Sequence, residues 1–234
     1  MKRGVVYRSG HLANLDAEDL ATLEPLGIRK VIDFRNRSDI DVDGGANLPR
    51  GAQRIHVPMG DPAEAPTDLR ELLEGGDPDA LAQHLGDGQA VTLMKHAVRA
   101  LVLEQCAGYA RMLRELAAPD GTPAIIHCSA GKDRTGWGAT LLLLIAGATD
   151  DAIIAHYLES NTYRAEENER ALARFPPSID PEWMRPFYEV RAEYKETSLA
   201  TLRAAWRNVD HYVTEGLGVS PETLATLRER LVGE

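Results

Sequence analysis

The sequence predicts an α/β fold, in which helices flank a mostly parallel central sheet. Short apolar runs with β-branched residues alternate with segments of helical pattern, at residues 4–7, 30–34, 54–57 and 123–127. Strands that alternate with helices are typical of parallel sheets, because a crossover helix must return the chain before the next strand pairs. The last run leads straight into a cysteine and then into an apolar helix, so the strand, loop and helix follow one another without a spacer.

Helices are predicted between and after these strands. Asp16 is the expected N-cap of a helix that ends at Gly27. Residues 41–51, punctuated by Gly, Asp and Pro, are expected to form a loop. The other predicted helices cover a short piece near 69–73 and residues 90–116, 135–146, 149–159, 162–174, 181–195, 198–215 and 220–232.

Composition and charge limit the function classes. The 234 residues are 44% hydrophobic and 26% charged, which fits one large globular domain. The formal net charge is −10, so we expect no nucleic-acid partner and no general attraction to anionic membranes. An anionic substrate must therefore be bound by a local basic pocket. The oligomeric state is not predicted.

The cysteines and the apolar segments indicate the cellular compartment in which we expect the protein. Only Cys106 and Cys128 occur, too few for a disulfide framework, which favours a reducing compartment. Residues 1–16 contain no apolar stretch of signal-peptide length, and the apolar run 141–148 is too short to span a bilayer. We expect a soluble protein that is cytoplasmic, or secreted without a signal peptide.

One loop carries most of the chemistry. The string HCSAGKDRTG, residues 127–136, lies where a strand ends and a helix begins. A cysteine attacks as its thiolate, and the start of a helix, where backbone N–H groups converge, favours that form and also binds phosphate. Gly131 allows a tight fold in which successive N–H groups, those of Ser129, Ala130 and Gly131, point inward. This pattern predicts that Cys128 is a nucleophile at an anion-binding loop.

Arg134 and Thr135 complete the predicted loop. The Arg134 guanidinium can grip two phosphate oxygens, and its spacing from Cys128 lets both residues face one phosphate. The Thr135 hydroxyl can help the sulfur to leave in a second step. Because the amides and Arg134 already neutralise the phosphoryl charge, no metal or cofactor is expected. The alternatives are a structural cysteine, our interpretation of Cys106, and a sulfurtransferase or arsenate reductase.

The loop resembles the active-site signature of the protein tyrosine phosphatases. Its Ala-Gly-Lys-Asp-Arg version is similar to a bacterial branch that includes a secreted mycobacterial tyrosine and lipid phosphatase and a Listeria lipid phosphatase. Residues 7–12, 26–28, 31–35 and 216–220 are also similar to that branch, so the resemblance spans nearly the whole chain. Two mild departures are Phe34 in place of Leu and Asp39 where Glu is common.

The resemblance implies a cysteine-phosphatase fold and a cysteine-dependent phosphatase. The implied reaction is hydrolysis of phosphate monoesters, phosphotyrosine and also phosphoserine or phosphothreonine, through a cysteinyl-phosphate intermediate. A phosphoinositide lipid phosphatase is the alternative, and a non-catalytic phosphate-binding module is a remote one. The expected partner is thus a phosphoprotein or a phosphoinositide.

Three carboxylates compete for the role of general acid. The Trp-Pro-Asp motif of many tyrosine phosphatases is absent, and the resemblance suggests Asp133, inside the loop, instead. Asp33 is the main alternative, because it ends a predicted central strand; its other interpretation is a salt bridge to Arg134 or Arg35. Asp61 ranks third as a candidate for the general acid. Its structural interpretation is a solvated turn residue.

Further basic residues are expected at the same edge of the sheet. Lys132 adds a second positive charge, and phosphoinositide phosphatases of this superfamily often carry such a lysine. By resemblance, Arg8, Arg35 and His56 can line the pocket; otherwise they form ordinary surface pairs.

Residues 160–197 are expected to form a helical lid on a single phosphatase domain spanning 1–234. The segment combines many charges with Phe175, Trp183, Phe187 and Tyr188. In the resembled family a helical pair here can cover the active site and shield the thiolate. Membrane contact is expected only through such a lid. The other interpretation is two amphipathic helices packed on the body.

Overall fold

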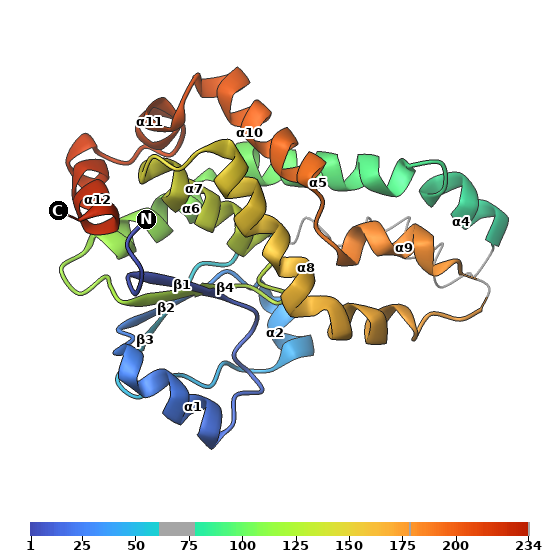
Figure 1. Cartoon of the computed structure of the whole chain (residues 1–234), viewed down its shortest axis with the longest axis horizontal. Coiled ribbons are helices and arrows are strands. Elements are labelled where there is room, and N and C mark those ends of the chain that lie inside the picture. Colours follow the sequence, from blue (N-terminus) through green and yellow to red (C-terminus); the bar gives the residue numbers. More distant parts are fainter. Residues whose placement is uncertain (61–77, 178, 234) are drawn as a thin grey trace.

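The computed structural model describes residues 1–60, 78–177 and 179–233. Its centre is a 4-stranded sheet in the order β1-β4-β2-β3, built from β1 (Val6–Ser9), β2 (Lys30–Asp33), β3 (Gln53–His56) and β4 (Ala124–His127) (Figure 1). Each neighbouring pair is parallel, as the sequence predicts. The register places Ser9 and Asp33 beside His127, so the carboxyl ends of the strands meet where β4 runs into Cys128.

The helices follow the sheet in chain order. They are α1 (Ala17–Leu23), the 3-10 turn η1 (Glu24–Leu26), α2 (Arg37–Asp43), α4 (Pro78–Leu85), α5 (Gln89–Glu104), α6 (Cys106–Ala117), α7 (Arg134–Ile145), α8 (Asp150–Leu172), α9 (Pro181–Tyr188), α10 (Ala192–Trp206), α11 (Val209–His211), the π-helical turn η2 (Tyr212–Gly216) and α12 (Pro221–Val232).

The two central strands are buried on both faces. In β2 and β4, Ile32 and Ile126 belong to the main core, to which α6, α7 and α12 also contribute. Val31 and Ile125 point the other way, into a smaller cluster with Leu12. This alternation follows from the two-residue period of a strand, and it explains why both strands are apolar throughout.

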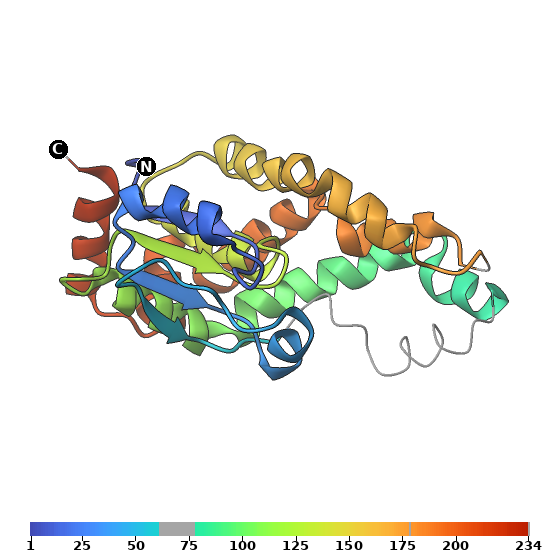
Figure 2. The ribbon, with the colours of Figure 1, turned by 90° about the horizontal axis from the view of Figure 1, so that it is seen from below.

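Four helical segments form a second body beyond the carboxyl end of the sheet (Figure 2). We call this the helical extension: α4, α9, the first half of α5 and the second half of α8. Its own apolar cluster includes Leu81, Leu172 and Met184. None of the described helices combines the length and apolar character needed to cross a bilayer.

Several predicted helix boundaries are wrong. The helix predicted over 90–116 breaks at Gln105, whose carbonyl accepts hydrogen bonds from Gly108 N and Tyr109 N and so begins α6. Conversely, the two helices predicted at 149–159 and 162–174 are one helix, α8. The apolar repeat runs on across the first break, so local periodicity cannot locate it.

The predicted helices 181–195 and 198–215 are also divided differently. An extended link at Glu189–Arg191 separates α9 from α10. The Asn161 side chain holds this link, because its Nδ2 donates to Val190 O and its Oδ1 accepts from Val190 N, both at 2.8 Å. This break is therefore imposed by a contact from another helix.

The loop predicted at 41–51 begins inside a helix. α2 runs over residues 37–43, and Asn36 and Asp39 form a capping box, in which each side chain accepts the other residue's backbone N–H. The short helix predicted near 69–73 lies outside the described residues, as does Asp61.

Candidate active site

The loop after β4 wraps its backbone around the Cys128 sulfur. Cys128 is 2% exposed, and Gly131 N donates a hydrogen bond to its Sγ at 3.2 Å. Gly131 has a φ of 68°, and a Cβ there would lie 2.4 Å from Ser9 O. Only glycine satisfies both the left-handed backbone and this close approach. The loop is thus shaped to direct an N–H group at the sulfur, as the sequence predicts.

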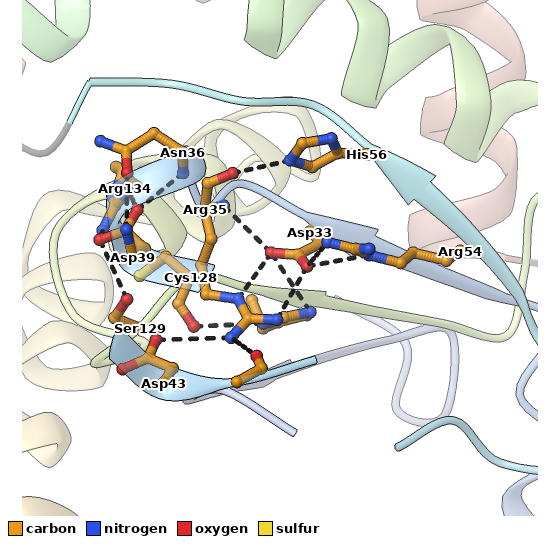
Figure 3. A network of polar contacts seen from close by, with 12 residues as sticks. Asp33, Arg35, Asn36, Asp39, Asp43, Arg54, His56, Cys128, Ser129 and Arg134 are labelled. Carbon is orange, nitrogen blue, oxygen red and sulfur yellow. Dashed lines mark hydrogen bonds and ion pairs between the residues drawn. The ribbon is translucent and has the colours of Figure 1, made fainter. Parts of the chain in front are cut away.

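Arg134 is held in place by a residue from a distant helix. Its Nη1 and Nη2 contact Asp39 Oδ2 and Oδ1 at 2.5 and 3.2 Å, and Arg134 is 2% exposed (Figure 3). Ser129 Oγ donates to the same carboxylate at 3.2 Å. Burial raises the pKa of Asp39, but the hydrogen bonds and charge of Arg134 outweigh it, and the net shift is downward. Asp39 therefore ties both ends of the loop to α2.

Asp33 is the centre of a buried ion-pair cluster. It is completely buried and accepts hydrogen bonds from Arg35 Nε at 3.1 Å and from Arg54 Nη2 at 2.6 Å. Burial opposes ionisation, yet the bonds from Arg35 and the charge of His127 lower the pKa of Asp33 to about 2. The geometry supports the salt bridge to Arg35 that was one of the two interpretations of Asp33.

Asp133 is almost buried and lines a pocket that also contains Cys128. It is 6% exposed; its Oδ1 accepts from the Tyr157 hydroxyl at 3.2 Å, and its Oδ2 lies 3.4 Å from Lys132 Nζ. Lys132 is buried as well, and its Nζ donates to the carbonyl of Phe187 in α9. The loop lysine is thus bound to the helical extension, and the loop aspartate to the first half of α8.

A pocket of about 130 Å³ joins the loop to the helical extension. Its loop side consists of Cys128, Ala130, Lys132, Asp133 and Arg134, and its other side of Arg164, Phe187 and Tyr188. Arg164 donates from Nη1 to Ala130 O at 3.3 Å and pairs with Glu167 at 3.1 Å. The sequence indicates the two aromatics only as apolar residues of the expected lid, and it gives no signal for Arg164.

Other predicted residues lie around the loop, outside the lining of that pocket. Arg8 donates to Gly131 O at 2.7 Å and to Ser160 Oγ at 2.9 Å, on a neighbouring pocket. His56 is exposed and contacts Arg35 O through Nε2 at 2.8 Å. Thr135 is fully buried, and its hydroxyl has no hydrogen-bond partner among the described residues.

His127 supports the loop from the end of β4. Its Nδ1 contacts Cys128 O at 3.1 Å, and burial lowers the pKa of the ring despite the nearby Asp33 carboxylate. The His127 side chain therefore supports the loop through this contact with the Cys128 carbonyl. Over the described ranges, no three His, Cys, Asp or Glu side chains come together as a metal site would require.

Comparison with known proteins agrees with this geometry. The tyrosine phosphatase family model matches residues 1–233. The chain belongs to the tyrosine phosphatase family. It is 34% identical to a candidate tyrosine-protein phosphatase of Cupriavidus necator, over 94% of this chain and 76% of that protein. It is 30% identical to the triple specificity protein phosphatase PtpB of Mycobacterium tuberculosis, over 100% of this chain and 92% of the relative.

A third relative is a tyrosine-protein phosphatase of Nostoc commune, 26% identical over 96% of this chain and 73% of that protein. Membership in the family makes this chain a phosphoric monoester hydrolase that acts on phosphorylated substrates through a cysteine. The fold class and the enzyme class predicted from the sequence are confirmed.

Proposed function

We propose that Cys128 is the nucleophile, that Arg134 and the loop amides hold the phosphate, and that Asp133 is the general acid. The observation that carries this proposal is the shared pocket lined by Cys128, Asp133 and Arg134, with Gly131 N bonded to the sulfur. The sulfur attacks phosphorus, the P–O bond to the leaving group breaks, and Asp133 gives its proton to the leaving oxygen. Water then attacks phosphorus and gives a proton to the Asp133 carboxylate, while the P–S bond breaks and Cys128 leaves as its thiolate.

The assignment of Asp133 over Asp33 rests on their surroundings. Asp33 is fixed by Arg35 and Arg54, and a carboxylate with a pKa of about 2 has no proton to give near neutral pH. Asp133 faces the pocket and has one oxygen free of the Tyr157 bond. We assign Asp33 to the support of the loop and Asp133 to proton transfer.

The decisive variant is Cys128→Ser. We expect phosphatase activity toward phenyl phosphate to fall by at least ~10⁴-fold, because serine is a far weaker nucleophile in a site that lacks a base for it. Binding of a non-hydrolysable phosphotyrosine analogue should persist within a few-fold. Unchanged turnover in Cys128→Ser would refute the proposal.

For substrates, we propose phosphotyrosine first, with phosphoserine and phosphothreonine also accepted. The pocket is narrow and has two aromatic walls, Phe187 and Tyr188, which suit a phosphorylated phenol ring. A phosphoinositide is the second candidate, favoured by two cations, Lys132 and Arg164, in the same pocket. Values of kcat/KM for a phosphotyrosine peptide, a phosphoserine peptide and a soluble phosphoinositide, measured on one preparation, distinguish the two.

We propose further that residues 160–197 act as a lid on a single phosphatase domain covering 1–234. Phe187 and Tyr188 line the same pocket as Cys128, and Lys132 bonds the Phe187 carbonyl, which supports a closed lid. A closed apolar lid should slow oxidation of the thiolate. Phe187→Ala is therefore expected to speed inactivation by hydrogen peroxide several-fold; an unchanged rate would argue against shielding.

The two free thiols support a reducing location, for which we propose the cytoplasm. The alternative is release without a signal peptide. Fractionation of cells that produce the protein distinguishes the two, since an extracellular majority would contradict the first.

A further inference from the structure

Behind the catalytic loop, a buried tyrosine contacts the proposed acid without lining the pocket. Tyr157 of α8 is 2% exposed, and its hydroxyl donates to Asp133 Oδ1 at 3.2 Å. Its ring packs against Gly136, where a Cβ would lie 3.1 Å from the ring. The contact between α8 and α7 is therefore close enough to fix the tyrosine relative to the loop.

A buried lysine lies over the ring of that tyrosine. Lys195 of α10 is 3% exposed, and its Nζ lies 4.2 Å from the centroid of the Tyr157 ring and 5.5 Å from that of Trp137. Among the described residues, its one hydrogen bond, to Gly136 O, is long at 3.5 Å. Burial, together with the charge of Arg8, lowers the pKa of Lys195 to about 7, against the opposing effect of Asp133.

Burial of the Lys195 ammonium lowers the stability of the fold. An ammonium group with a single long hydrogen bond loses much of its hydration energy on burial, and an apolar side chain of similar length would avoid that loss. Groups that cost stability are found preferentially at functional sites. A cation over a phenol ring draws electron density from it and makes the hydroxyl a better donor. Lys195 is thus placed to strengthen the bond from Tyr157 to Asp133.

The bond also decides which oxygen of Asp133 reacts. Because the Tyr157 hydroxyl occupies Oδ1, the transferable proton must be held on Oδ2. Oδ2 is the oxygen beside Lys132, whose Nζ is 3.4 Å away.

We infer that Tyr157, supported by Lys195, is a positioning residue that holds Asp133 Oδ2 toward the leaving group. This inference rests on the proposed role of Asp133. Tyr157 and Lys195 are not in the lining of the pocket, so their effect on the reaction must pass through Asp133. It should consequently depend on how much the leaving group needs a proton.

The test compares two substrates that differ in that need. Phenyl phosphate has a basic leaving group that requires protonation, whereas 4-nitrophenyl phosphate has a far less basic one. At about pH 6, where Lys195 is charged, kcat/KM of Tyr157→Phe should fall ~10-fold for phenyl phosphate and less than ~2-fold for 4-nitrophenyl phosphate. Lys195→Met should show the same selectivity at about 3-fold, with thermal stability unchanged or raised. Tyr212→Phe is the matched control, because it removes a buried hydroxyl bonded to Val102 O at 2.8 Å in the main core.

Asp133→Asn in the same assay tests the role of Asp133 as the acid separately from the role of Tyr157 as a positioning residue. It should lose about 10²-fold or more with phenyl phosphate and far less with 4-nitrophenyl phosphate. Equal losses in Asp133→Asn would mean that the proposed acid is wrong. A selective loss in Asp133→Asn with no selective loss in Tyr157→Phe or Lys195→Met would overturn this inference alone.

Discussion

The catalytic loop is one continuous run of chain, residues 128–134, whereas the opposite wall of its pocket comes from two helices. Arg164 comes from α8, and Phe187 and Tyr188 come from α9. A loop between a strand and a helix can be specified by its own residues, because the strand end and the helix start already fix its geometry. The helical wall exists only once distant segments have packed. We therefore expect changes near the loop to affect the chemistry, and changes in the helical extension to affect mainly substrate binding.

Among residues outside the loop and its pocket, Asp39 should have the largest effect on activity, because it holds the loop from α2. Asp39→Asn removes the charge that holds the Arg134 guanidinium in its bidentate pair, so kcat/KM for phenyl phosphate should fall ~10²-fold through misplacement of Arg134. Asp41→Asn is the control on the same helix, because the partner of Asp41 among the described residues is the exposed Arg37. Equal activities of the two variants would show that Arg134 needs no support from α2.

The next effect concerns stability in acid. The folded pKa of Asp33, about 2, lies below the ordinary aspartate value of 3.8, so its carboxylate contributes stability above about pH 4 that is lost as the pH falls toward 2. The contribution is roughly 2 kcal/mol, from the size of that shift. In urea unfolding, the stability difference between the wild type and Asp33→Asn should therefore shrink by about that amount across this range.

Asp150 provides the comparison for this prediction. Its pKa is also lowered, by hydrogen bonds from Arg203, but the pair is on the surface, with side chains 40% and 49% exposed. Asp150→Asn should change stability by less than ~1 kcal/mol at any pH. If the free energy of unfolding of Asp33→Asn differs from that of the wild type by as little as that of Asp150→Asn at every pH, the buried cluster does not stabilise the fold.

The smallest effect should come from the helical wall. Arg164→Ala removes a positive charge from the pocket together with the hydrogen bond to Ala130 O, but it removes no N–H donor of the loop, so KM for phenyl phosphate should rise ~10-fold with kcat within ~3-fold. Arg170→Ala, on the same helix with an exposed partner in Glu166, should leave both constants unchanged. A fall in kcat that exceeds the rise in KM would place Arg164 in the chemistry and weaken the contrast between the two walls.

The sequence was sufficient for the parallel sheet and for the loop, because both depend on short local patterns. Apolar β-branched runs pair as buried strands. The N–H of Gly131 bonds the sulfur of a cysteine only three residues away. Asp39 appeared only as a mild departure from a family pattern, since its pairing with Arg134 joins residues 95 apart. The break held by Asn161, and the positions of Arg164 and Tyr157, likewise depend on helix packing. No local pattern records such contacts.

The most direct test of the proposed mechanism is to trap the cysteinyl-phosphate intermediate on Cys128. The enzyme is mixed with a good phosphotyrosine substrate, denatured within milliseconds and digested, and the peptides are analysed by mass spectrometry. We predict that one phosphoryl group is found on the peptide that contains Cys128, and that it is absent from Cys128→Ser. A phosphoryl group on any other residue, or rapid turnover with no phosphorylated peptide even when breakdown is slowed by low temperature, would contradict the mechanism.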